Sequence, residues 1–128
     1  MSDIHQEITF DASAKAVYKA LTDSSEFAKF TGAEARIDAT EGGAFLCFGT
    51  FIAGRNVELV PDRRIVQAWR VFNWPDGVYS IVRFELTEED GKTTVVLDQA
   101  GVPEDATKHV DGGWGVKYWE PLRAYLEG

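Results

Sequence analysis

Hydrophobic and polar residues alternate over residues 4–10, with Ile4, Gln6, Ile8 and Phe10 on one side, as in a half-buried strand. Ser13 precedes residues 14–21, where apolar positions recur at helical spacing. We expect a short helix there with Ser13 as its N-cap. A second capped helical turn is predicted over residues 25–30.

Six further strands are predicted between residues 33 and 100, because short β-type runs alternate with turn residues. They span residues 33–39, 44–48, 51–60, 64–72, 78–87 and 93–100. Glu41-Gly42-Gly43 is a turn signal, Trp74-Pro75-Asp76-Gly77 favours a type I turn, and Asp90-Gly91 favours a tight hairpin. Such short connections favour antiparallel pairing.

Residues 101–128 form an amphipathic pattern that predicts a long C-terminal helix. Its apolar stripe consists of Val110, Trp114, Tyr118, Pro121 and Tyr125, flanked by Trp119, Leu122 and Leu126. The apolar arc covers about half the circumference, so we expect the sheet on one side and the two short helices on the other. Pro121 cannot donate a helical hydrogen bond. We favour a single kinked helix, and two helices broken near residues 118–120 are the alternative.

This order of elements predicts an α+β fold. A curved antiparallel sheet of about six to seven strands would surround the C-terminal helix, with two short helices after the first strand. The length of 128 residues predicts one domain, spanning residues 1–128.

Strand parity predicts which side chains face the helix, because the charged residues must lie on the water side. The inward residues are Ile65, Gln67, Trp69, Val71, Ser80, Val82, Phe84, Leu86, Val95, Leu97 and Gln99. Three of these, Gln67, Ser80 and Gln99, are polar. We favour bonding to each other, to backbone or to trapped water. The alternative is that they line a cavity and contact a polar group of an otherwise apolar ligand.

Composition narrows the class of partner. The net charge of −8 opposes binding to nucleic acid or to an anionic membrane surface. No apolar run of about 18 residues and no basic-then-apolar leader occur, so we expect neither a membrane span nor a secretory signal. The lone Cys47 favours a reducing cytoplasm. Four Trp, four Tyr and eight Phe predict either a well-filled core or an aromatic-lined cavity.

The sequence contains no evident catalytic constellation. His5, His109 and Cys47 lack metal-ligand spacing, and no serine lies in a nucleophile elbow. We interpret Asp105 and His109 as an exposed helical pair. No catalytic residue, metal or cofactor is therefore predicted.

Three glycines cluster in Asp111-Gly112-Gly113-Trp114-Gly115, where each costs about 1 kcal/mol relative to alanine in a helix. Either the helix begins only near Trp114, or the backbone passes close to something that a Cβ would block.

Several short segments occur in the order and spacing of a known family over residues 8–126. They are Glu41-Gly42-Gly43-Ala44-Phe45, Leu59-Val60-Pro61, Ile65-Val66 with Trp69-Arg70, Trp74-Pro75-Asp76-Gly77, Gly101-Val102-Pro103, Gly113-Trp114 and Tyr118-Trp119-Glu120-Pro121-Leu122. Together they resemble the C-terminal domain of the activator of Hsp90 ATPase, within the START and Bet v 1-like helix-grip superfamily. The resemblance implies a curved sheet gripping a long C-terminal helix, with a cavity between them.

The leading functional hypothesis is a non-enzymatic domain that encloses a small, largely apolar or aromatic ligand. Its predicted contacts are Trp69, Val71, Phe84, Trp114 and Tyr118 as walls, and Gln67, Ser80 and Gln99 as polar groups. The alternative is a protein-interaction module acting on an Hsp90-type chaperone, with Trp74 as an exposed anchor. A weaker alternative is a cyclase-type or hydrolase-type enzyme using Tyr118 or a cavity water. We expect a monomer or a homodimer.

Overall fold

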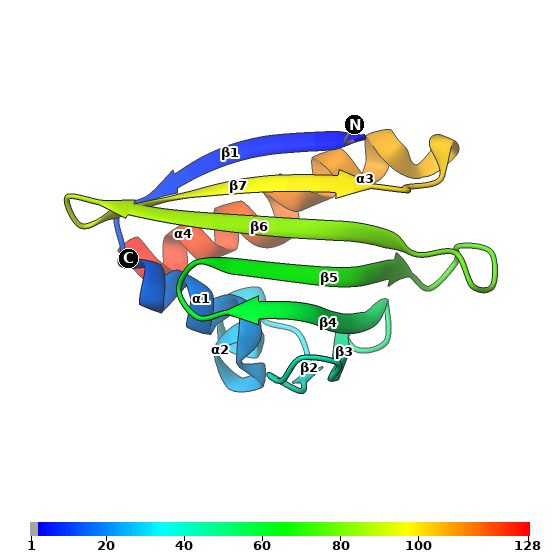
Figure 1. Ribbon diagram of the computed structural model, residues 1–128, viewed down its shortest axis with the longest axis horizontal. Helices are drawn as coiled ribbons and strands as arrows, with labels where there is room; N and C mark the ends of the chain where they lie inside the picture. The colour runs from blue at the N-terminus through cyan, green and yellow to red at the C-terminus, as the bar shows by residue number, and fades with distance from the viewer. Residues whose placement is uncertain (1–2) are drawn as a thin grey trace.

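The computed structural model describes residues 3–128 and contains a seven-stranded antiparallel sheet with the helices gathered on one face (Figure 1). The order across the sheet is β1-β7-β6-β5-β4-β3-β2, so the first strand pairs with the last. The strands are β1 (Ile4–Phe10), β2 (Ala35–Ile37), β3 (Ala44–Cys47), β4 (Ile52–Val60), β5 (Arg64–Val71), β6 (Ser80–Glu89) and β7 (Lys92–Ala100). The predicted α+β helix-grip architecture is confirmed.

Two short helices follow β1, each with a side-chain cap. The Ser13 hydroxyl accepts a 3.1 Å hydrogen bond from the Ala16 N–H at the start of α1 (Ala14–Thr22), as predicted. Helix α2 (Ser24–Thr31) begins one residue earlier than predicted and is capped by Asp23, whose Oδ2 accepts from the Glu26 N–H at 3.0 Å. Its C-cap is Gly32 in the left-handed region.

The C-terminal segment follows one uninterrupted helical path. It comprises the 3-10 turn η1 (Glu104–Ala106), α3 (Thr107–Gly113), the π-helical segment η2 (Trp114–Trp119) and α4 (Glu120–Glu127). The predicted single helix is confirmed, and the alternative of two helices broken near residues 118–120 is not observed. Pro121 follows a widened turn in which the Glu120 N–H bonds the Gly115 carbonyl, five residues back. None of the helices formed by residues 3–128 is long and apolar enough to span a bilayer.

The π-helical segment corrects the predicted apolar stripe. A π turn holds more residues than an α turn, so the buried face moves along the sequence after Tyr118. Trp119 and Leu122, predicted as flanking positions, are buried, whereas Tyr125 is 37% exposed. A helical wheel at a constant angle per residue cannot anticipate that shift.

The helix is covered on two sides, as its wide apolar arc predicts. The sheet lies on one side. On the other, the Phe27 ring of α2 packs edge-on against Tyr118, with centroids 5.6 Å apart, and the Phe30 ring lies 6.3 Å from that of Tyr125. The short helices therefore close the core opposite the sheet.

The hairpin turn is confirmed, but the turn after β5 differs from its prediction. Asp90 and Gly91 both have positive φ, which a tight I′ hairpin requires. In the other turn the Val78 N–H bonds the Pro75 carbonyl and Gly77 has φ 76°. Glycine therefore occupies the third position, as in type II rather than type I. The turn also buries Trp74 to 6% exposure, against Trp69, so the prediction of an exposed Trp74 anchor is wrong.

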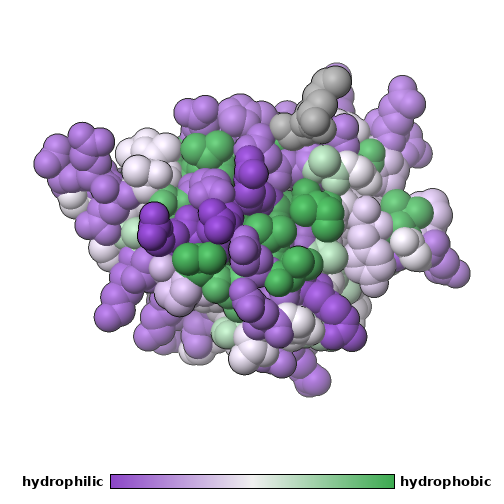
Figure 2. Space-filling view, in the orientation of Figure 1, coloured by the Kyte–Doolittle hydropathy of each residue, from purple (hydrophilic) through white to green (hydrophobic). Residues whose placement is uncertain are grey.

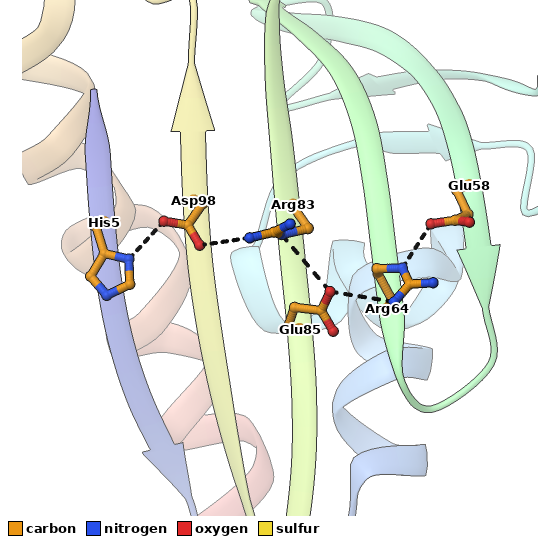
Figure 3. Close-up of polar contacts among 6 residues, drawn as sticks. All are labelled: His5, Glu58, Arg64, Arg83, Glu85 and Asp98. Atoms are coloured by element: carbon orange, nitrogen blue, oxygen red, sulfur yellow. Dashed lines mark hydrogen bonds and ion pairs between the residues drawn. The ribbon is translucent and has the colours of Figure 1, made fainter. Parts of the chain in front are cut away.

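The outward face of the sheet is mainly hydrophilic, with hydrophobic groups set among the polar ones (Figure 2). A row of alternating charges crosses five strands on this face (Figure 3). Its members are His5, Asp98, Arg83, Glu85, Arg64 and Glu58, joined by contacts of 2.7 to 3.8 Å. Exposed ion pairs each contribute about 0–1 kcal/mol, so this row orients side chains more than it stabilises the fold.

Candidate ligand pocket

A pocket of about 470 Å³ opens between the first half of the C-terminal helix and the ends of β4 and β5. The sheet side consists of Phe51, Ile52, Trp69 and Val71. The apolar residues of the helix side are Val110, Trp114, Val116 and Tyr118. This size and this mainly apolar lining are typical of small-molecule sites.

A larger hollow, of about 600 Å³, lies on the outward face of the sheet. Arg64, Arg83 and Glu85 line it, and these side chains already pair with one another or with other members of the charged row. The pocket between sheet and helix is therefore the better candidate for an apolar ligand.

Two helix glycines form part of the pocket wall. Gly112 and Gly113 line the pocket, and a Cβ built on either would meet no atom within 4 Å. The interpretation that the helix begins only near Trp114 is wrong, because α3 begins at Thr107. Within residues 3–128, no protein atom outside the helix backbone lies close to either position, so a close approach by the protein itself does not explain these glycines. The missing side chains instead leave room in the pocket.

Four of the five predicted wall residues lie together at the pocket. Trp69 and Val71 come from β5, and Trp114 and Tyr118 from the helix. The Trp69 and Trp114 rings stack with centroids 5.4 Å apart. Phe84 does not line the pocket, because its ring packs edge-on against Trp114 deeper in the core.

The three predicted polar groups lie outside the pocket and are satisfied by protein partners. Gln99 Oε1 accepts from the Trp114 indole N–H at 2.8 Å. Its amide nitrogen donates to the Ser80 hydroxyl at 3.0 Å, and that hydroxyl donates to the Trp69 carbonyl. Gln67 donates to Asn56 at 3.1 Å. Bonding to each other and to backbone, the interpretation favoured from the sequence, accounts for Gln99 and Ser80, whereas Gln67 is satisfied by the Asn56 side chain instead.

The Trp69 indole nitrogen is buried away from solvent and, among residues 3–128, has no hydrogen bond of good geometry. Its polar neighbour is the Tyr118 hydroxyl. Burial raises the pKa of the neighbouring Tyr118 well above its usual value, although the Trp69 indole lowers it in part. The Tyr118 phenol therefore stays protonated at neutral pH.

Sequence reasoning missed the residues at the pocket mouth, among them Phe51, Lys108, His109, Val116 and Lys117. The glycine cluster of residues 111–115 was the sequence signal for these positions, because glycines leave part of the helix surface without side chains. The predicted Asp105–His109 pair does not form among residues 3–128; His109 instead lies on the pocket wall.

The described residues offer little for covalent or metal chemistry. Within residues 3–128, no three His, Cys, Asp or Glu side chains gather closely enough to hold a metal ion. Burial raises the pKa of Cys47 to about 12, which keeps the thiol unreactive.

The curved sheet clasping a terminal helix defines a helix-grip protein, and the comparisons specify the family. The model described as "Activator of Hsp90 ATPase homolog 1-like protein" matches residues 11–127, and the chain belongs to that family. It is 32% identical over 124 residues to "Activator of 90 kDa heat shock protein ATPase homolog 2" of Mus musculus. That match covers 97% of this chain but 38% of the mouse protein, and the other curated relatives are covered to 28–36%.

Solved structures with the same fold extend the comparison. An HSP90 activator from Plasmodium falciparum has a TM-score of 0.89 at 22% identity, with 97% of this chain and 96% of that chain covered. The Aha1 dimer from Colwellia psychrerythraea has a TM-score of 0.81 at 22% identity, with 97% and 95% covered. At 22% identity, both comparisons show a shared fold alone.

Proposed function

We propose that this domain binds a small, largely apolar or aromatic molecule in the pocket between β5 and the C-terminal helix, without converting it. The observation that supports this most directly is the mainly apolar pocket of about 470 Å³, whose helix side carries no side chain at Gly112 and Gly113. An apolar ligand would replace water along its aromatic walls.

The absence of a side chain at Gly113 provides a direct test. Gly113 lines the pocket, whereas Gly115 does not, and a Cβ at either position meets no atom within 4 Å. Gly113→Leu should fill part of the pocket, and Gly115→Leu is its matched control. Both variants add the same side chain to the same helical segment.

The experiment uses 2-naphthol and decanol as apolar probes with the intact chain. A bound probe should raise the melting temperature with the logarithm of its concentration, and about 2.7 kcal/mol of stabilisation is expected at 100 times the Kd. Gly113→Leu should lose the shift and Gly115→Leu should keep it. No shift for either probe, or an equal shift in both variants, would refute the proposal.

A second candidate function is regulation of an Hsp90-type chaperone, favoured by relatives that are named as activators of the 90 kDa heat shock protein ATPase. The chain spans less than two fifths of those relatives, so their activity is a hypothesis for this chain. With Trp74 buried, the exposed aromatic pair Phe51–Phe72 is the surface available as an anchor. These rings are 44% and 59% exposed, with centroids 4.9 Å apart.

ATP turnover by a purified Hsp90-type chaperone, with and without the chain, tests this second function. Turnover should rise with the wild-type chain and fall back with Phe72→Ser. Val57→Ala, at another exposed apolar position, is the control. Unchanged turnover together with no detectable complex would exclude the chaperone role.

A further inference from the structure

The lining of the pocket contains basic side chains and no acidic ones. Lys108, His109 and Lys117 line the pocket, and no Asp or Glu does so. This is unexpected in a chain whose net charge is −8, with 21 acidic and 13 basic side chains. The pocket is therefore a locally basic opening on an acidic protein.

Both lysines are available to a ligand. Neither Lys108 nor Lys117 forms an ion pair among residues 3–128, and both are exposed. The acid between them in sequence, Asp111, is engaged elsewhere, because its Oδ1 accepts a 2.8 Å hydrogen bond from Gln6.

The order of residues along the helix places the charges beside the opening. Gly112 and Gly113 lie between the two lysines in sequence and present no side chain to the pocket. A ligand passing this open stretch of wall would lie between two lining residues that carry ammonium groups, Lys108 and Lys117. The inner walls, by contrast, are the aromatic surfaces of Trp69, Trp114 and Tyr118.

We infer that the ligand is an amphipathic organic acid, with its apolar body against Trp69 and Trp114 and its carboxylate at the mouth between Lys108 and Lys117. The inference rests on the proposed function and specifies its ligand class. The two ammonium groups stabilise the carboxylate, and the apolar body supplies most of the burial. A neutral molecule of the same shape would lose the first contribution and keep the second.

Two probes of similar shape, one charged and one neutral, separate the effect of the ligand's charge on binding from the effect of its shape. We would titrate the intact chain with 2-naphthoic acid and with the neutral 2-naphthamide at neutral pH, following tryptophan fluorescence, since Trp69 and Trp114 line the pocket. The acid should bind about three- to ten-fold more tightly, because each exposed pair contributes modestly. The preference should shrink as salt is added.

The double variant Lys108→Gln/Lys117→Gln should abolish most of this preference. Lys15→Gln/Lys92→Gln changes the net charge equally at exposed positions outside the pocket lining and should keep it. Equal binding of acid and amide to the wild type, or a preference that survives in Lys108→Gln/Lys117→Gln, would overturn the inference and leave the proposed function standing. If neither the acid nor the amide binds, the proposed function fails as well.

Discussion

The indole N–H of Trp114 donates a 2.8 Å hydrogen bond to Gln99 Oε1, which ties the C-terminal helix to strand β7 at a fully buried position. A second bond of the same kind joins Trp119 to Gln6 of β1 at 2.7 Å. The helix is therefore held to the sheet by two tryptophan–glutamine bonds as well as by ring packing. These bonds fix which helix face meets which strand.

Removing the acceptor of the first bond should destabilise the fold. Gln99→Leu would leave the buried Trp114 N–H unpaired and remove the donor to Ser80, so we expect the free energy of unfolding to fall by about 1–3 kcal/mol. Urea denaturation measures it. Thr87→Ala, on the exposed side of β6, should change stability by less than about 0.5 kcal/mol. Equal effects of the two substitutions would contradict this role for Gln99.

The helix glycines should be stabilised by a methyl group. Gly112→Ala and Gly115→Ala each place a Cβ in open space within a helix, so each should raise the free energy of unfolding by about 0.5–1 kcal/mol. Thermal or urea unfolding measures the gain. A loss of stability in both variants would contradict this expectation and show that the helical backbone at these positions requires glycine.

Gly54 in β4 should not tolerate the same methyl group. Its Cβ would collide with the Ala68 carbonyl oxygen and lie 2.6 Å from the Phe45 ring. We expect Gly54→Ala to cost about 3 kcal/mol or more, because neighbouring backbone must shift. Gly112→Ala, which adds the same group in open space, is the control in the same unfolding assay. Wild-type stability of Gly54→Ala would show that β4 and β5 lie farther apart.

His5 should make stability depend on pH. Its hydrogen bonds to Asp98 and then to Glu7 raise its pKa above the ordinary value of 6.5. A raised folded-state pKa gives stability that is fully present below pH 6.5 and is lost as the pH rises through the folded pKa. The melting temperature of the wild type should therefore exceed that of His5→Gln more at about pH 5.5 than at about pH 9. A difference that does not change with pH would rule out this linkage.

Cys47 should resist thiol reagents in the folded protein. The side chain is 3% exposed and burial raises its pKa to about 12, so almost no thiolate forms at neutral pH. Ellman's reagent should react with the chain in urea and not in buffer, and Cys47→Ala supplies the blank. Rapid labelling of the native protein would mean that the region around β3 opens readily.

The alternation of side chains along each strand predicted the interior most reliably. A charged residue must face water, and its two neighbours in the strand must then face the core. Arg83 and Glu85 placed Val82 and Phe84 inside, and both are almost fully buried. The helical wheel was less reliable. It failed after Tyr118, where the π turn moved the buried face to Trp119 and Leu122.

The candidate site was predictable in part. Trp69 and Trp114 could be expected to meet, because an inward strand position faces the apolar stripe of the helix. The basic residues of the pocket could not be predicted, because only the tertiary structure shows that Lys108 and Lys117 lie where the pocket opens. The turn residue Trp74 was placed outside because turn tips usually face water, but its ring packs against Trp69 instead.

The sequence by itself determined the order of the elements, the inward face of each strand and the helix caps, because these depend on near neighbours along the chain. The tertiary structure alone decided that Gln99 bonds Ser80, that the Trp69 N–H lacks a hydrogen bond of good geometry within the part of the chain that the structure describes, and that two glycines and two lysines of the C-terminal helix line an opening. Those features depend on distances between residues far apart in sequence, which hydrophobic periodicity does not encode.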